Sequence, residues 1–134
     1  MTQRMNKKGA KPPGVAKAKA EVREVAEFLW EQSPGHFGGA LSKILVSDKT
    51  PGARDLDFRI STYAPAAYVQ LHAHAAKQQI YYFLEGEGLL EFGDEKRIVR
   101  PQHFIFIPPH VPHGLHNTGG GQLVFMVITT PVRD

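Results

Sequence analysis

Residues 68–92 read YVQLHAHAAKQQIYYFLEGEGLLEF, and the fold is decided in this stretch. Three short runs rich in aromatic and aliphatic residues follow one another, separated by short turns, a pattern typical of antiparallel strands. Similar runs recur on both sides of the stretch at intervals of roughly 8–12 residues. The predicted strands cover residues 41–46, 57–63, 68–74, 79–84, 88–92, 96–100, 104–107, 113–117 and 122–129. The sequence therefore predicts an all-β fold, an antiparallel sandwich or small barrel.

A different pattern precedes the strands. In residues 21–32 the apolar side chains Val22, Val25 and Leu29 recur at helical spacing. Two glutamates lie in the first turn, where the helix dipole favours acidic groups. We expect one N-terminal amphipathic helix over residues 21–32, ended by the Ser-Pro-Gly of residues 33–35.

The charge of the chain is divided unevenly. Residues 1–20 hold six Lys and Arg side chains and no acidic one, and they lack apolar periodicity, so we expect a flexible basic tail. Residues 21–134 hold 10 of the 16 Lys and Arg residues and all 13 acidic ones, which leaves this part at −3 although the whole chain carries +3. A mildly acidic domain favours neither nucleic acid nor membranes as partners.

Length and composition exclude several classes of protein. With 134 residues the chain has room for about one domain, which we place at residues 21–134. No apolar run approaches the roughly 20 residues of a membrane span, and the basic start lacks the apolar stretch of a secretory signal, so we expect a soluble cytoplasmic protein. The chain has no cysteine, which excludes disulfides, thiolate zinc sites and iron–sulfur clusters. Any bound metal must use histidine, carboxylate or amide ligands.

Six of the seven histidines lie between residues 72 and 116. His72 and His74 are two residues apart on a predicted strand, so both imidazoles project from the same face. Gln79 begins the next strand after a short turn, and its amide can reach the space before that face. His113 follows a turn with three prolines, which hold its backbone in place. Three imidazole nitrogens and an amide oxygen suit one divalent metal ion such as Fe(II), Mn(II), Ni(II) or Zn(II).

The order of these residues resembles the two sequence motifs of the cupin superfamily. In this chain the motifs read His72-x-His74, four residues, Gln79, six residues, Gly86, and later Pro108-x-His110-x-x-His113-x-x-x-Asn117. Residues 83–88 (FLEGEG) and 107–113 (IPPHVPH) are especially similar to the family, and the 15 residues between the motifs, 87–101, match its short form. The resemblance implies a cupin-type jelly roll, also called a double-stranded β-helix, with a metal held by the four residues named above.

Four positions depart from the family's pattern. Ala66 stands where the first motif opens with glycine, Gln102 where the second does, and His110 replaces a turn glycine. The replacement of the turn glycine is permissible where the turn needs no positive φ. Gln79 stands where the family usually has a metal-binding glutamate. An amide leaves the charge of the ion uncompensated, so such a site favours an anionic or chelating substrate.

The resemblance implies a metal-dependent enzyme that acts on a small, partly anionic, oxygenated molecule. Three-histidine cupins include dioxygenases acting on thiols or diketones. A set of three histidines and one glutamine is similar to that of cupins that isomerise or open unsaturated uronates, and there Arg133 is a candidate for binding a substrate carboxylate. A non-catalytic module that binds a metal or small ligand stays open as well, since a fold does not fix a function.

Further side chains are candidates for the site. His110, in the turn at its mouth, and Tyr81 are candidates to move a proton. The apolar residues expected in phase with the ligands, as walls of a substrate pocket, are Phe83, Leu115 and Phe125. Tyr63, Arg59 and Gln70 are pocket candidates with no spacing rule behind them, whereas His36 and His103 are expected in solvated turns and His116 on the opposite face. Short exposed sheet edges favour a homodimer.

Overall fold

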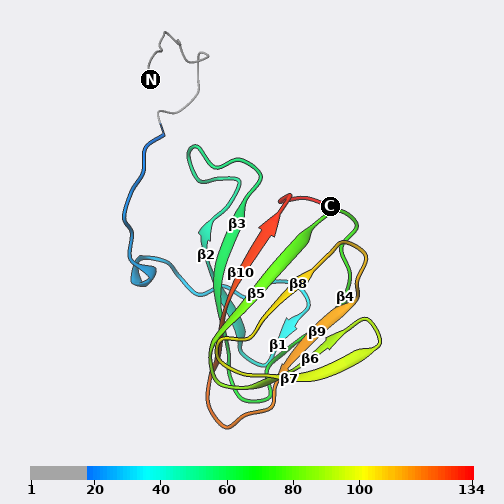
Figure 1. The fold of residues 1–134 in the computed structure, drawn as a ribbon. Helices are drawn as coiled ribbons and strands as arrows, with labels where there is room; N and C mark the ends of the chain where they lie inside the picture. Colours follow the sequence, from blue (N-terminus) through cyan, green and yellow to red (C-terminus); the bar gives the residue numbers. More distant parts are fainter. Residues whose placement is uncertain (1–17) are drawn as a thin grey trace.

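Two antiparallel sheets enclose the core of this protein (Figure 1), in a computed structural model that describes residues 18–134. One sheet has the strand order β1-β4-β9-β6-β7 and the other β2-β3-β10-β5-β8. The strands are β1 His36–Phe37, β2 Ala40–Val46, β3 Asp57–Tyr63, β4 Tyr68–His72, β5 Gln78–Glu85, β6 Gly88–Phe92, β7 Glu95–Val99, β8 Phe104–Ile107, β9 His113–Asn117 and β10 Leu123–Thr130. The predicted all-β jelly roll is confirmed.

The core follows from the alternation of side chains along each strand. On β5, Tyr81 and Phe83 point into the core and are buried, whereas Ile80 points outward and is exposed. Strand register then places residues of the same kind side by side, because Phe125 on β10 lies opposite Phe83 on β5. Their rings are 5.4 Å apart between centroids, and Leu115 from the other sheet is fully buried as well.

The turn after β5 depends on a glycine. Gly86 has φ +82°, a left-handed conformation that side chains with a Cβ atom rarely adopt. A Cβ at this position would also collide with the backbone of Gln122 and Leu123 at the start of β10. The glycine of the first motif is therefore required by both conformation and space.

Three of the positions where the family has glycine carry other residues in the same left-handed conformation. The φ angles of Ala66, Gln102 and His110 are +71°, +70° and +71°. The turns therefore keep the backbone that glycine favours, and the condition under which histidine replaces the turn glycine without strain, a turn that needs no positive φ, is not met at His110. The backbone N–H of His110 donates a 2.7 Å hydrogen bond to the carbonyl of His74, which helps to hold this turn.

The predicted N-terminal helix over residues 21–32 is wrong. A single 3-10 turn, Val25–Glu27, stands in its place, and Val22 and Leu29 are exposed. A helix of this length is marginal in water unless it buries an apolar face. The barrel instead offers the edge of β2, where Glu31 exchanges backbone hydrogen bonds of 2.8 and 2.9 Å with Ser42.

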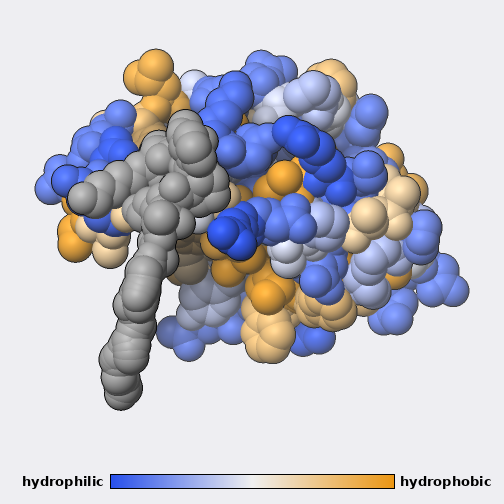
Figure 2. All heavy atoms as spheres, turned by 90° about the horizontal axis from the view of Figure 1, so that it is seen from above, coloured by the Kyte–Doolittle hydropathy of each residue, from blue (hydrophilic) through white to orange (hydrophobic). Residues whose placement is uncertain are grey.

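The chain ahead of this segment is described only in part. Residues 1–17, which make up most of the predicted basic tail, lie outside the described residues. Within residues 18–134 no helix has the length and apolar character needed to cross a membrane. Seen from above, the molecule presents mainly hydrophilic residues with smaller apolar clusters between them (Figure 2).

Candidate metal centre

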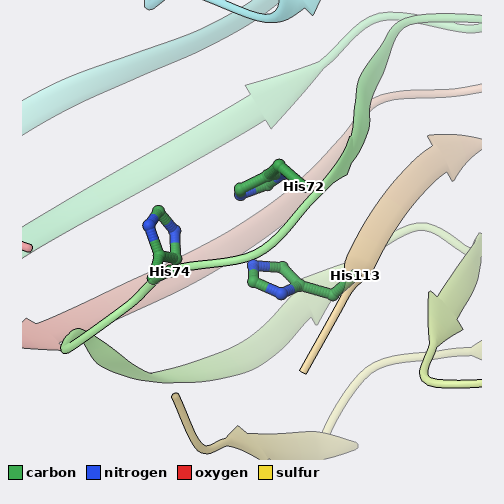
Figure 3. A group of neighbouring side chains, drawn as sticks. All are labelled: His72, His74 and His113. Atoms are coloured by element: carbon green, nitrogen blue, oxygen red, sulfur yellow. The ribbon is translucent and has the colours of Figure 1, made fainter. Parts of the chain in front are cut away.

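Three histidines, from two neighbouring strands and the loop after one of them, converge at one point (Figure 3). His72 is the last residue of β4, His74 follows in the loop, and His113 is the first residue of β9. One ring nitrogen of each lies within 4.8 Å of those of the others, and the closest ring centroids, those of His72 and His113, are 4.3 Å apart. The predicted strand 68–74 is shorter than expected, so His74 reaches the group from a loop rather than by strand alternation.

The backbone fixes two of the three rings. His72 Nδ1 lies 2.8 Å from the carbonyl oxygen of Gln70, and His113 Nδ1 lies 2.9 Å from that of Val111. Because a carbonyl only accepts, both Nδ1 atoms carry the proton and both Nε2 atoms keep a lone pair. This is the tautomer that a metal-binding imidazole requires.

A carboxylate fixes the third ring. Asp134 Oδ2 accepts a 3.0 Å hydrogen bond from His74 Nδ1, while its Oδ1 accepts two from the backbone N–H groups of Ala76 and Lys77, each 3.0 Å long. These two N–H groups are the main cause of the lowered pKa of Asp134, which therefore stays ionised. His74 Nε2 is left buried and without a partner among the described residues.

Gln79, near the start of β5, brings an oxygen to the same point. Its Oε1 lies 3.1 Å from His113 Nε2, and its Nε2 donates a 3.0 Å hydrogen bond to Thr129 Oγ1. With the amide oriented by Thr129, two acceptor atoms face each other with no proton between them. A cation placed between them would satisfy both.

Burial favours the neutral form of two of the rings. It lowers the pKa of His113 to about 4 and also lowers the pKa of His72, to which the neighbouring His74 contributes. Neutral imidazoles with free lone pairs, an orphaned Nε2 and a facing amide oxygen together fit a divalent metal ion. His72, His74 and His113 could hold it, and Gln79 is in place as a fourth ligand.

Two of the three histidines, His72 and His74, border a cavity of about 420 Å³ inside the barrel. One wall is apolar and includes Tyr81, Phe125 and Val127, whereas β2 and β3 contribute polar side chains. Its lining comprises Ser33, Pro34, Gly35, His36, Ser42, Asp57, Arg59, Ser61, Tyr63, Val69, Gln70, His72, His74, Lys77, Tyr81, Phe125, Val127, Thr129 and Val132. The cavity thus joins the histidine group to a second polar region.

Arg59 is the main charged group of that region. Its Nε and Nη2 donate hydrogen bonds of 2.7 and 3.0 Å to the two carboxylate oxygens of Asp57, and its Nη1 lies 3.4 Å from Ser33 Oγ. Nearby, the hydroxyls of Ser42 and Ser61 are 2.7 Å apart and buried. Asp57 and Ser33 fix the guanidinium in place on the wall of the cavity.

Some predicted pocket residues line the cavity and others do not. Tyr81 and Phe125 line it. So do Tyr63, Arg59 and Gln70, the pocket candidates for which the sequence offered no spacing rule. Phe83 and Leu115 do not line it, because both are fully enclosed by the core deeper in the barrel.

Two predicted site residues point elsewhere. The side chain of His110 is exposed and does not line the cavity, because the backbone of its turn is tied to the carbonyl of His74. Arg133 does not line it either, since its Nη2 pairs with Asp48 Oδ2 at 2.7 Å on the surface.

Two residues at the site were missed by reasoning from the sequence. His36, expected in a solvated turn, lines the cavity, and its Nδ1 donates to the carbonyl of Pro34 at 2.9 Å. Asp134 carries no local signal, because it contacts His74 only after the chain has crossed the barrel.

Comparison with known proteins agrees with this architecture. The chain is 39% identical over 61 residues to an uncharacterized protein of Methanocaldococcus jannaschii, a match over 46% of this chain and 49% of that protein. This match therefore spans about half the length of the curated relative.

Solved structures show the same fold at low identity. A predicted oxalate decarboxylase from Thermotoga maritima superposes with a TM-score of 0.76 at 24% identity, covering 83% of this chain and 99% of that one. The polyketide cyclase RemF from Streptomyces resistomycificus gives 0.73 at 24%, covering 84% and 80%. KdgF from Halomonas sp. gives 0.71 at 23%, covering 87% and 97%.

The family itself is shown by a sequence model. The model of the cupin domain family matches residues 59–129, more than half of the chain, and this range contains all three histidines and Gln79. The chain belongs to the cupin domain family.

Proposed function

We propose that this protein is a metal-dependent enzyme that isomerises, or opens the ring of, a small anionic oxygenated molecule by proton transfer. The observation that carries the proposal is the convergence of three imidazole nitrogens and an amide oxygen beside a cavity with a fixed guanidinium. A divalent ion held there supplies a Lewis acid that polarises substrate oxygens. Two of the structural neighbours are named for reactions on oxygen-rich molecules, a polyketide and oxalate.

The charge of the cavity favours an anion. None of the four proposed ligands is negative, and the carboxylate of Asp134 lies behind His74 rather than at the proposed ion. Lys77 and Arg59 add positive charge at the lining of the cavity, where Asp57 is the only carboxylate among the lining residues. Three of the five guanidinium N–H groups of Arg59 bond to described residues, which leaves two for a substrate carboxylate. Arg59 therefore binds and orients the end of the substrate remote from the histidines.

Two cavity residues are suited to move a proton. Burial raises the pKa of Tyr81, so its hydroxyl stays protonated and can donate. The Nδ1–H of His36 donates a hydrogen bond to the carbonyl of Pro34, so the proton stays on Nδ1 and the lone pair of Nε2 is free to accept another proton. A proton taken from carbon at His36 Nε2 and one returned from Tyr81 Oη leave the composition of the substrate unchanged, as an isomerisation requires. The apolar wall limits the access of water to this step.

The test is turnover of metal-loaded protein against unsaturated uronates, diketones and thiols, followed by NMR in D₂O and by an oxygen electrode. We expect turnover of an anionic substrate, with deuterium incorporated at carbon and no oxygen consumed. Tyr81→Phe should lower kcat while keeping the metal content, and Arg59→Gln should mainly raise KM. Oxygen uptake in step with product would replace the proposal by dioxygenation, and tight binding without turnover would make the protein a binding module.

A further inference from the structure

Each of the two sheets ends in an edge strand, β7 in one and β8 in the other, and residues 100–103 join these two strands. A cleft of about 430 Å³ opens between the two edges, lined by residues of β6, β7, β8 and their connection, and we call it the edge cleft. None of its lining residues belongs to the cavity beside the metal centre, and the buried Phe83 and Leu115 line neither. The edge cleft is therefore a second, separate cavity of the barrel.

The floor of the edge cleft is apolar. Leu90 and Val99 line it from the core, where they are 2% and 5% exposed. Phe92 and Ile105 pack against that core but stay partly exposed to the cleft. At about 30 Å³ per water the cleft has room for roughly 14 water molecules, and its volume falls in the range of about 300–1,000 Å³ that is common for small-molecule sites. A ligand with an apolar chain or ring of about ten non-hydrogen atoms therefore fits.

One charged side chain stands on the core side of β7 and lines this cleft. Arg97 lies opposite the buried Leu90 on β6, and residues opposite each other on paired strands share a face of the sheet. Among residues 18–134 Arg97 has no carboxylate within 4 Å, and the rest of the chain contains no acidic side chain. Its neighbour Arg100, by contrast, pairs with Glu87 at 3.5 Å outside the cleft. The guanidinium of Arg97 is therefore free to bind an anion.

The connection from β7 to β8 adds two hydrogen-bond donors to the lining. His103 Nδ1 accepts a 3.0 Å hydrogen bond from the backbone N–H of Arg100, so the proton of the neutral ring lies on Nε2. Gln102 also lines the cleft, in the left-handed conformation with φ +70° that glycine favours. Its backbone N–H donates a 2.8 Å hydrogen bond to the carbonyl of Phe83, which holds the connection in place. An imidazole N–H and an amide thus accompany the guanidinium.

We propose that the edge cleft binds a small carboxylate that carries an apolar chain or ring. Its apolar part lies on the floor of the cleft, and its carboxylate accepts hydrogen bonds from Arg97, whose planar fork of N–H groups matches the two oxygens. His103 Nε2–H is the second donor. An inward charge on an edge strand also discourages pairing with another sheet, but that role needs neither the cleft nor the donors beside it. The site takes a ligand independently of the metal centre.

Titration of the full chain with octanoate, 1-octanol and acetate, followed by methyl NMR in the presence of Zn(II), tests the site. Octanoate should shift the methyl signals of Leu90 and Ile105, whereas the signals of Val127 report the metal cavity separately. We expect a Kd for octanoate of about 1 mM or tighter, as is usual for about ten non-hydrogen atoms. 1-Octanol lacks the charge and acetate lacks the chain, so each should bind at least about fivefold more weakly.

The substitution Arg97→Gln should weaken octanoate binding about 5–10-fold, because it removes charged hydrogen bonds at a partly solvated site, and should leave 1-octanol binding unchanged. Arg100→Gln is the matched control, since its side chain is 60% exposed outside the cleft, and it should bind octanoate like the wild type. Melting temperatures check folding, and Arg97→Lys, which should lie between Arg97→Gln and the wild type in affinity, serves if Arg97→Gln does not fold.

Four results would overturn the proposal. Octanoate shifts confined to Val127 would assign the ligand to the metal cavity. Binding of 1-octanol as tight as that of octanoate would leave only an apolar groove, and equally tight binding of acetate would leave only a surface charge. Unchanged octanoate affinity in folded Arg97→Gln, or in Arg97→Lys where it stands in, would reduce the arginine to protection of the sheet edge.

Discussion

The substitution Asp134→Asn separates the orientation of His74 from the fold around it. In the structure Oδ1 of Asp134 accepts from the backbone N–H groups of Ala76 and Lys77, and Oδ2 accepts from His74 Nδ1. An asparagine has only one oxygen. If that oxygen stays on the two backbone N–H groups, its NH₂ group faces His74 Nδ1, and the imidazole proton moves to Nε2.

The proton then occupies the nitrogen that faces the proposed metal. Loss of such a supporting partner typically costs about 10–100-fold in metal affinity, so we expect the Kd for Zn(II) or Mn(II) to rise by about that factor. Two of the three hydrogen bonds of Asp134 persist in the favoured orientation, so the Tm of the metal-free protein should change little. Competition against a chromophoric chelator measures the Kd, and thermal melting by circular dichroism measures the Tm.

The matched control is the neighbouring residue. Arg133→Ala removes a surface pair with Asp48 whose arginine side chain is 80% exposed, and it touches neither the histidines nor the cavity. Its Kd for the metal should equal that of the wild type. An Asp134→Asn protein that binds metal as tightly as the wild type would refute the role of the carboxylate in selecting the tautomer of His74.

The remaining predictions concern the turns. Replacing Ala66, Gln102 or His110 by glycine should stabilise the protein by up to about 1 kcal/mol each, because the left-handed strain of about 1–2 kcal/mol exceeds the entropy that glycine adds to the unfolded chain. Denaturant unfolding measures this, and three variants no more stable than the wild type would contradict the strain. Gly86→Ala should destabilise the protein by more than Gly93→Ala, since both have positive φ but a Cβ at Gly93 meets no atom within 4 Å. Equal losses in the same assay would show that the contact with β10 is unimportant.

The strands could be predicted because their information is local. Alternation along residues 79–84 indicated a strand with one buried face, and β5 runs from Gln78 to Glu85 with Tyr81 and Phe83 buried. The spacing of His72 and His74, with His113 after the proline-rich turn, predicts that the three histidines share one site, and in the structure they do. The order of motif residues thus carried more information than any single histidine.

The parts that failed depend on contacts distant in sequence. The sequence of residues 21–32 has a helical pattern, but in the structure Glu31 pairs with Ser42 on the edge of β2, and Val22 and Leu29 stay exposed. The support of His74 by Asp134 and the pairing of Arg133 with Asp48 span 60 and 85 residues. No periodicity encodes such pairs, so the cavity could be expected from the sequence while several of its members could not.

Metal stoichiometry tests the central claim most directly. The protein is stripped with a chelator, reloaded with Zn(II) or Mn(II), desalted and measured by plasma emission spectrometry. The wild type should retain one equivalent, and the double variant His72→Ala with His113→Ala should retain none. His116→Ala, which changes a histidine stacked on Tyr68 outside the cluster, should retain one equivalent as the control. A full equivalent in a folded double variant, or none in the wild type, would contradict the metal centre described above.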